Sequence, residues 1–205
     1  MAAPFSDFSG IAAPMPGANI NTDAIIPSAW LRTATADYGK GLFGRQRYDD
    51  EGRERPGFVL NREPFRHAEI LVAGPNFGCG SSREAAVWAL AGFGLKCVLA
   101  PSFADIFYEN AYRNGLLVAR IDPETLVDLI DFSSRSAEPR LGVNLANETL
   151  DCADGRVWRM SVPPSRKQAL MLGEDEIECT LRHERDISAF HAAASAQMPW
   201  LYLRQ

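Results

Sequence analysis

The stretch from Glu69 to Ala91 constrains the fold and the chemistry of this chain more than any other. It reads EILVAGPNFGCGSSREAAVWALA, in which an apolar strand over 70–73 leads through a turn with three glycines into a helical segment. A turn of this kind presents backbone N–H groups and the positive end of a helix dipole to one point in space. We therefore expect an anion-binding site at this turn.

Three familiar glycine motifs do not fit the segment Gly78–Glu84, which reads GCGSSRE. A dinucleotide-binding fingerprint requires glycine where Arg83 stands, and a nucleophile elbow also requires glycine there. A phosphate-binding P-loop requires Gly-Lys followed by Ser or Thr, which is absent. The sequence thus argues against a dehydrogenase, a kinase and a serine hydrolase.

Two interpretations of the turn remain open. Ser81 with Glu84 three residues later is a capping-box pattern, in which the serine hydroxyl serves only the helix backbone. Alternatively, Arg83 binds a carboxylate and Ser81 removes a proton from the carbon next to it. The cation at the positive end of a helix favours the second interpretation, because it indicates an anionic partner.

Composition limits the other possibilities. The chain has 205 residues and a net charge of −5, which argues mildly against nucleic acid or an anionic membrane as partner. Its four cysteines form no CxxC pair and it has only three histidines, so a metal that takes part in the reaction is expected on another chain. No apolar run reaches the ~18 residues needed to cross a bilayer, and the first residues do not resemble a signal peptide. We therefore expect a cytoplasmic protein.

The rest of the chain predicts one α/β domain over 1–205. Strands alternate with helices between 69 and 121, which is typical of a parallel sheet, and shorter strands after 140 indicate antiparallel hairpins. The expected strands are 69–74, 96–100, 116–119, 142–145, 148–152 and 157–162. The expected helices are 82–93, 103–114, one that is capped by Asp122, 165–172 and 187–196.

The segment 28–57 is predicted to be a long connection. It is rich in glycine and arginine, and a loop of this length without structure of its own is usually functional or disordered. We expect a mobile loop that closes over an anionic substrate; a solvated insertion is the alternative.

The motif Gly78–Glu84 resembles the core motif of the aconitase superfamily. Within that superfamily the chain is similar to the separate small subunits of the bacterial dehydratases that isomerise isopropylmalate. Further segments support the resemblance in the family's order, namely Asn19–Pro27, Gly39–Phe43, Ala73–Glu84, Pro101–Phe107, Asn110–Leu117 and Pro199–Leu201. Together they cover nearly all of the chain.

This resemblance implies a fold, a reaction and a partner. The fold is the swivelling β/β/α three-layer domain of the aconitase C-terminal type, with a mixed sheet around a parallel βαβαβ core. The reaction isomerises 2-isopropylmalate to 3-isopropylmalate in leucine biosynthesis, through loss and return of water. The partner is a large subunit, in a heterodimer or heterotetramer, whose own cysteines bind a 4Fe–4S cluster that acts as Lewis acid.

The resemblance also assigns roles to individual residues. Ser81 corresponds to the base that removes and returns the proton, and Ser82 and Arg83 hold a substrate carboxylate. Thr22 and Asp23 face the active site. Arg32 lies on the loop that selects the side group of the substrate.

Four positions depart from the family pattern. Asn21, Ala24, Ala85 and Val87 stand where the family commonly has Asp, Gln, His and Pro. These departures leave open a paralogue for another hydroxy-diacid, of the citraconate, methylmalate or homoaconitate kind. A non-catalytic assembly or regulatory module is the third possibility, with Ser81 acting only as a helix cap.

Overall fold

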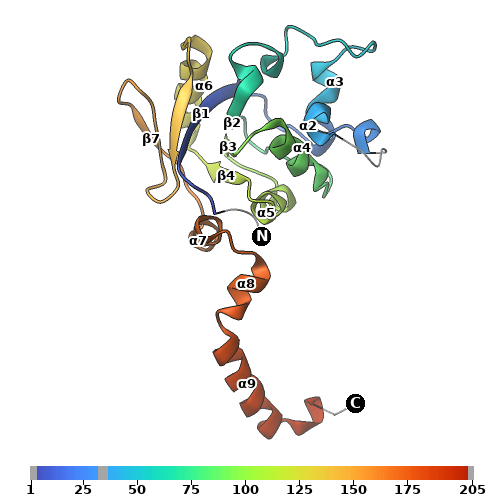
Figure 1. The fold of residues 1–205 in the computed structure, drawn as a ribbon, viewed down its shortest axis with the longest axis vertical. Coiled ribbons are helices and arrows are strands. Elements are labelled where there is room, and N and C mark those ends of the chain that lie inside the picture. Colours follow the sequence, from blue (N-terminus) through green and yellow to red (C-terminus); the bar gives the residue numbers. More distant parts are fainter. Residues whose placement is uncertain (1–3, 32–36, 203–205) are drawn as a thin grey trace.

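The computed structural model of this protein describes residues 4–31 and 37–202. Its centre is a seven-stranded mixed sheet in the order β4-β3-β2-β1-β5-β6-β7 (Figure 1). The strands are β1 (Phe8–Met15), β2 (Ala68–Ala73), β3 (Cys97–Ala100), β4 (Leu117–Arg120), β5 (Arg140–Asn144), β6 (Thr149–Asp151) and β7 (Val157–Arg159). β1 to β4 pair in parallel, whereas β5 to β7 are antiparallel, so the predicted mixed sheet with a parallel core is confirmed.

Helices connect and cover these strands. The α-helices of the main body are α1 (Thr22–Ile25), α2 (Tyr38–Gly41), α3 (Gly44–Arg47), α4 (Ala85–Phe93), α5 (Asp105–Arg113), α6 (Pro123–Arg135) and α7 (Pro164–Leu172). The short 3-10 helices are η1 (Ser28–Leu31), η2 (Val59–Asn61) and η3 (Phe65–His67). α6 packs on β1 and β2, while α4 contacts α1, α2 and α5. As predicted, Asp122 caps α6, because its carboxylate accepts a hydrogen bond from the Thr125 N–H at 2.7 Å.

The central strand β1 is one of the elements that the sequence prediction missed. Gly10 and Pro14 give it the appearance of a turn-rich segment, yet both have a structural reason within the sheet. A Cβ on Gly10 would lie 2.7 Å from the Cβ of Glu69 on β2, so only glycine permits this close approach. Pro14 lies beyond the stretch of β1 that pairs with β5, so no ladder hydrogen bond to β5 is lost at that residue.

The segment 28–57 differs from the predicted long connection. Its described part forms η1, α2 and α3, and Leu42 and Phe43 belong to the hydrophobic core. The guanidinium of Arg47 is buried, where it donates to the Asn61 side chain at 3.0 Å, and burial lowers the pKa of Arg47. This part of the chain is therefore packed rather than structureless. Its mobility stays a prediction.

The last helices leave the body. α8 (Glu176–Leu181), α9 (Glu184–Gln197) and η4 (Pro199–Leu201) follow α7 and extend away from the sheet (Figure 1). The sequence predicted α7 and most of α9 but missed α8. In the part of the chain that the structure describes, no helix is both long and apolar enough to cross a membrane.

Candidate active site

The candidate site forms where the segments that follow β1 and β2 meet. The Gly78 N–H donates to the Ile20 carbonyl at 2.8 Å, and the Thr22 N–H donates to the Cys79 carbonyl at 2.8 Å. Asn21 and Cys79 form an isolated parallel bridge between these bonds. The glycine turn is thus attached to a polar segment that lies almost sixty residues earlier in the sequence.

Two glycines make this turn possible. Gly78 has φ +76°, and a Cβ there would lie 2.2 Å from the Phe107 Cγ, inside the aromatic cluster of Phe77, Phe103 and Phe107. Gly80 has φ +101°, and a Cβ there would lie 3.3 Å from the Thr22 hydroxyl oxygen. Both positions require the left-handed region, and Gly78 also requires the absence of a side chain.

Ser81 is paired with Thr22. The two hydroxyl oxygens are 2.8 Å apart, and the Ser81 N–H donates to the Thr22 oxygen at 3.1 Å. Thr22 is 1% exposed, whereas Ser81 is exposed. Either hydroxyl can be the donor in this pair, and when Thr22 donates, its hydrogen points to the Ser81 oxygen. A hydrogen bond in this direction favours a negatively charged Ser81 oxygen.

The capping-box interpretation of Ser81 is wrong. α4 begins at Ala85 rather than at 82, with Glu84 as the N-cap residue and no side-chain hydrogen bond at that cap. The Ser81 hydroxyl is held by Thr22 instead. The capping pattern was misleading because a tertiary partner, absent from the local sequence, takes the hydroxyl.

Arg83 has an anionic partner within the chain. Its Nη1 lies 2.7 Å from the Asp23 Oδ1 and donates to the Ile26 carbonyl at 2.8 Å. The Arg83 side chain is 20% exposed and that of Asp23 is 57% exposed. Both contacts use Nη1, so in the described residues the edge formed by Nε and Nη2 makes no hydrogen bond. That edge can receive a carboxylate in the two-bond geometry that guanidinium groups prefer.

The structure brings together four of the six predicted site residues, namely Thr22, Asp23, Ser81 and Arg83. Ser82 stands next to them on the surface, and its hydroxyl makes no side-chain hydrogen bond within the described part of the chain. Arg32 lies outside the described residues.

The sequence analysis missed a second set of residues that support the turn. Asn114, at the end of α5, donates to the Glu84 carboxylate at 2.8 Å and accepts from the Trp88 indole at 3.0 Å. Asn76 donates from its backbone to the Ser102 hydroxyl at 2.8 Å and from its side chain to Asn19 at 2.8 Å. The only signal for the Asn76 contacts was the short polar residues that follow apolar strands, and Asn114, at the end of a helix, carried no such signal.

Three of the four departures from the family pattern have local explanations, and nothing in the structure explains the fourth, Ala24. The Asn21 side chain accepts from the Ala24 N–H at 2.8 Å and caps α1, a role that Asp fills equally well. Ala85 and Val87 belong to α4, and their side chains are buried in the core. These two side chains therefore contribute to packing rather than to the exposed surface around Ser81.

The described residues contain no group of three or more His, Cys, Asp or Glu side chains that could hold a metal ion. Cys97 is fully buried, and this burial raises the pKa of its thiol. Cys79 lies in the turn and is half-buried. This part of the chain therefore offers no ligand set for an iron–sulfur cluster.

Two family models match the chain. Residues 2–124 match the model of the aconitase C-terminal domain. Residues 176–203 match the model of the C-terminal domain found in small subunits of 3-isopropylmalate dehydratase. The body that carries the serine–arginine turn thus has the fold of an aconitase C-terminal domain, which confirms the predicted fold.

Full-length relatives show to which family of proteins with the aconitase C-terminal domain this chain is similar. A 3-isopropylmalate dehydratase small subunit from Dinoroseobacter shibae is 47% identical over 96% of this chain and 98% of its own length. The one from Gluconobacter oxydans is 46% identical over 95% of both chains. A crystal structure of 3-isopropylmalate dehydratase from Methanocaldococcus jannaschii has a TM-score of 0.62 at 27% identity, covering 90% of this chain and 99% of that one. The chain belongs to the 3-isopropylmalate dehydratase small subunit family, and that designation implies a large-subunit partner.

Proposed function

We propose that this chain is the small subunit of a hydro-lyase that interconverts 2-isopropylmalate and 3-isopropylmalate by loss and return of water. The observation that carries the proposal is that the neighbouring residues Thr22 and Asp23 hold the Ser81 hydroxyl and the Arg83 guanidinium respectively. The full-length relatives that share the name of this enzyme support the choice of substrate.

Ser81 is the proposed base. Its oxygen takes the proton from the carbon that is to become part of the double bond, and the electrons of the broken C–H bond form the alkene. The hydroxyl leaves with the electrons of the C–O bond and becomes water by taking a second proton, which we assign to solvent or an acidic group of the large subunit. When water adds back in the opposite orientation, Ser81 returns the proton to the other carbon. The hydrogen bond from Thr22 and the nearby positive charge of Arg83 favour the deprotonated serine that this step requires.

Arg83 and its neighbours orient the substrate. Asp23 and the Ile26 carbonyl fix one end of the guanidinium, so its free edge is held in place for a substrate carboxylate. Ser82 directly precedes Arg83 in the chain, and its hydroxyl supplies a further hydrogen-bond donor for the carboxylate. We assign selection of the substrate's side group to Arg32, as the family resemblance implies.

The remaining chemistry is assigned to the large subunit. The family resemblance implies a Lewis acid that assists departure of the hydroxyl group, and the described residues contain no group of three or more side chains that could hold a metal ion. We therefore place a 4Fe–4S cluster on the large subunit, in a heterodimer or heterotetramer. We also propose a cytoplasmic location, which the four free cysteines support because unpaired thiols are typical of reducing compartments.

Reconstitution tests this proposal. The purified chain is mixed without oxygen with the large subunit of its own organism, and formation of the alkene is followed by its ultraviolet absorbance. We expect activity only from the pair, with isopropylmalate turned over faster than citramalate or homocitrate. A preference for one of the other two acids would identify a paralogue, and a pair that forms without any activity would indicate an assembly module.

A further inference from the structure

The C-terminal arm, defined here as residues 174–202, presents an unusual surface. From 187 to 202 it contains no Asp, Glu, Lys or Arg. Most of its large apolar side chains are exposed, among them Phe190 at 67%, Trp200 at 64% and Leu201 at 64%. By contrast, the aromatic rings of α5 are buried, whereas the Phe190 ring stays exposed although it packs against the ring of His191. Exposed apolar surface of this extent marks an interaction site.

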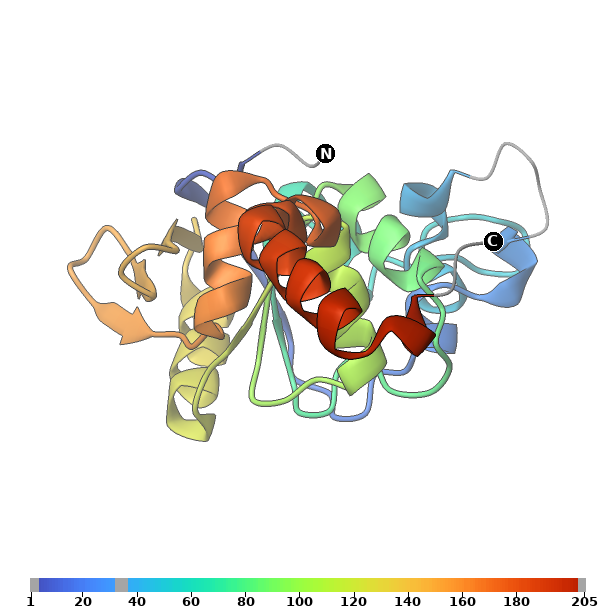
Figure 2. The ribbon, with the colours of Figure 1, turned by 90° about the horizontal axis from the view of Figure 1, so that it is seen from below.

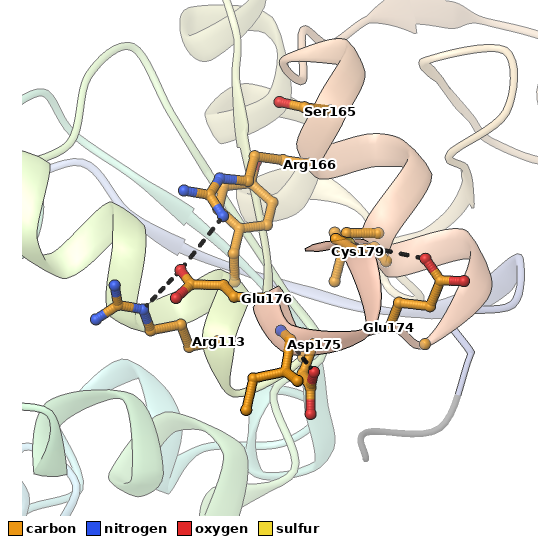
Figure 3. Close-up of a pocket in the computed structure, with 13 residues that line it drawn as sticks. Arg113, Ser165, Arg166, Glu174, Asp175, Glu176 and Cys179 are labelled. Carbon is orange, nitrogen blue, oxygen red and sulfur yellow. Dashed lines mark hydrogen bonds and ion pairs between the residues drawn. The ribbon is translucent and has the colours of Figure 1, made fainter. Parts of the chain in front are cut away.

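The base of the arm is attached to the body (Figure 3). Glu176 at the start of α8 accepts from the Arg113 guanidinium of α5 at 3.1 Å, and Arg166 of α7 lies 4.0 Å from the same carboxylate. Arg166 also pairs with Glu109 of α5. These contacts surround a cavity of about 460 Å³ between α5, α7 and α8. The direction in which the arm leaves the body is therefore set by charged contacts at its base.

The tip of the arm folds back on itself. The Tyr202 hydroxyl lies 3.3 Å from the His191 Nδ1, and η4 contacts α9. This fold buries Ala194 but leaves Phe190 and Trp200 largely uncovered. The arm thus has a defined shape with an apolar surface that residues 4–31 and 37–202 leave uncovered. Trp and Phe in such a position are typical of the residues that dominate binding energy at interfaces.

We propose that the C-terminal arm docks onto the large subunit, inserting Phe190 and Trp200 into an uncharged apolar groove of that partner. This proposal rests on the proposed function, which requires a large subunit to complete the site at Ser81. Residues 176–203 match a domain model that is named for the small subunits of this enzyme. The arm is therefore a feature of chains whose name implies a large subunit.

The position of the arm agrees with this partner. It extends away from the body in Figure 1, and from below α9 crosses beneath α5 in Figure 2. The N-terminal half of α5 carries Phe107, which packs directly against the active-site turn at Gly78. The other end of α5 carries Arg113, which donates to Glu176 at the base of the arm. The turn and the arm are thus attached to the same helix, so a large subunit that covers the open site lies near the arm as well.

The test compares two pairs of substitutions in the full chain. Phe190→Asp with Trp200→Asp places charges on the arm, and Val127→Asp with Val157→Asp places them on equally exposed apolar positions of α6 and β7. Binding to the purified large subunit is measured by calorimetry, and the fold of each variant is checked by circular dichroism. We expect the arm variant to bind roughly 30-fold more weakly or worse, and the body variant to bind within about threefold of the wild type. Turnover of the arm variant should return to normal at saturating concentration.

Other outcomes separate this proposal from the proposed function. Unchanged binding of a folded arm variant would overturn the docking role, and loss of self-association with unchanged large-subunit binding would assign the arm to a second copy of this chain. If the wild-type pair binds but has no turnover, the reaction is wrong while the arm is still tested by binding. If the wild-type chain does not bind the large subunit, both proposals are wrong.

Discussion

The active-site turn and the C-terminal arm are both exposed, but they are built in opposite ways. The turn is polar, and its exposed Ser81 rests on a buried threonine and on backbone bonds to the segment after β1. The arm is apolar, and beyond its base most of its side chains touch little of their own chain. Tertiary contacts hold the groups of the turn in position, whereas the apolar side chains of the arm are exposed in the described structure.

The two surfaces therefore gain different things from a binding partner. A preorganised polar turn gains catalytic power when water is excluded and a substrate is supplied, because its groups are already held in position. An uncovered apolar helix gains binding energy when its surface is removed from water. Substitutions in the turn should therefore affect turnover or stability, and substitutions in the arm should affect association alone.

The largest effect is expected from Ser81→Ala. Removing the proposed base should lower turnover of the reconstituted pair by about 10³-fold. Steady-state kinetics and calorimetry should show this loss together with unchanged affinity for the large subunit. Ser134→Ala, on an exposed position of α6, is the matched control. Turnover of Ser81→Ala within tenfold of the wild type would remove this residue from the role of base.

Gly78→Ala should destabilise the chain itself. A Cβ at φ +76° would collide with Phe107, so we expect the free energy of unfolding to fall by about 3 kcal/mol in urea denaturation. Gly52→Ala is the control, because φ there is +77° and no atom lies within 4 Å of the added Cβ. That variant should lose only about 1 kcal/mol. Equal losses would mean that backbone strain, rather than the contact with Phe107, limits the turn.

Arg83→Lys should weaken substrate binding while it preserves the positive charge. The lysine cannot make two parallel hydrogen bonds to a carboxylate, so kcat/KM should fall by roughly 30-fold, mainly through KM. Kinetics with Arg62→Lys, on an exposed position away from the turn, provides the comparison. An unchanged KM would show that the carboxylate is held elsewhere.

Thr22→Val keeps the shape of the buried side chain and removes its hydroxyl. Without that hydrogen bond to Ser81, kcat should fall about tenfold, while KM changes little. Thr22→Ser should restore most of the rate, because it returns the hydroxyl. A Thr22→Ser variant as slow as Thr22→Val would indicate that only packing at this position matters.

The smallest effect is expected for the stability of the arm. Phe190→Ala should change the free energy of unfolding by no more than about 0.5 kcal/mol, since its ring is exposed. Phe107→Ala, a buried ring in the aromatic cluster, should cost about 3–4 kcal/mol in the same measurement. A large loss for Phe190→Ala would show that the arm is part of the folding unit and that its apolar surface is not simply uncovered.

The type of fold and the location of the chemistry could be predicted from the sequence. Apolar runs at β2, β3 and β4 with intervening helices predicted a parallel core, since buried parallel strands are continuous apolar segments. The spacing within Gly78–Glu84 excluded other glycine motifs, and the ordered family segments located the site. Local propensity also predicted the Asp122 cap, because a cap depends only on residues three positions apart.

The pairing of the site residues could not be predicted from the sequence, because it depends on contacts between distant segments. Thr22 and Ser81 are 59 residues apart in the chain, and no local pattern distinguishes a serine that caps a helix from one held by a distant threonine. The same holds for Asp23 beside Arg83, and for β1, whose glycine is explained only by the approach of β2. A helix cap contributes about 1 kcal/mol, which is comparable to the contribution of one tertiary hydrogen bond. The fold therefore determines whether a serine hydroxyl caps a helix or bonds a distant residue, because the fold places the distant partner beside it.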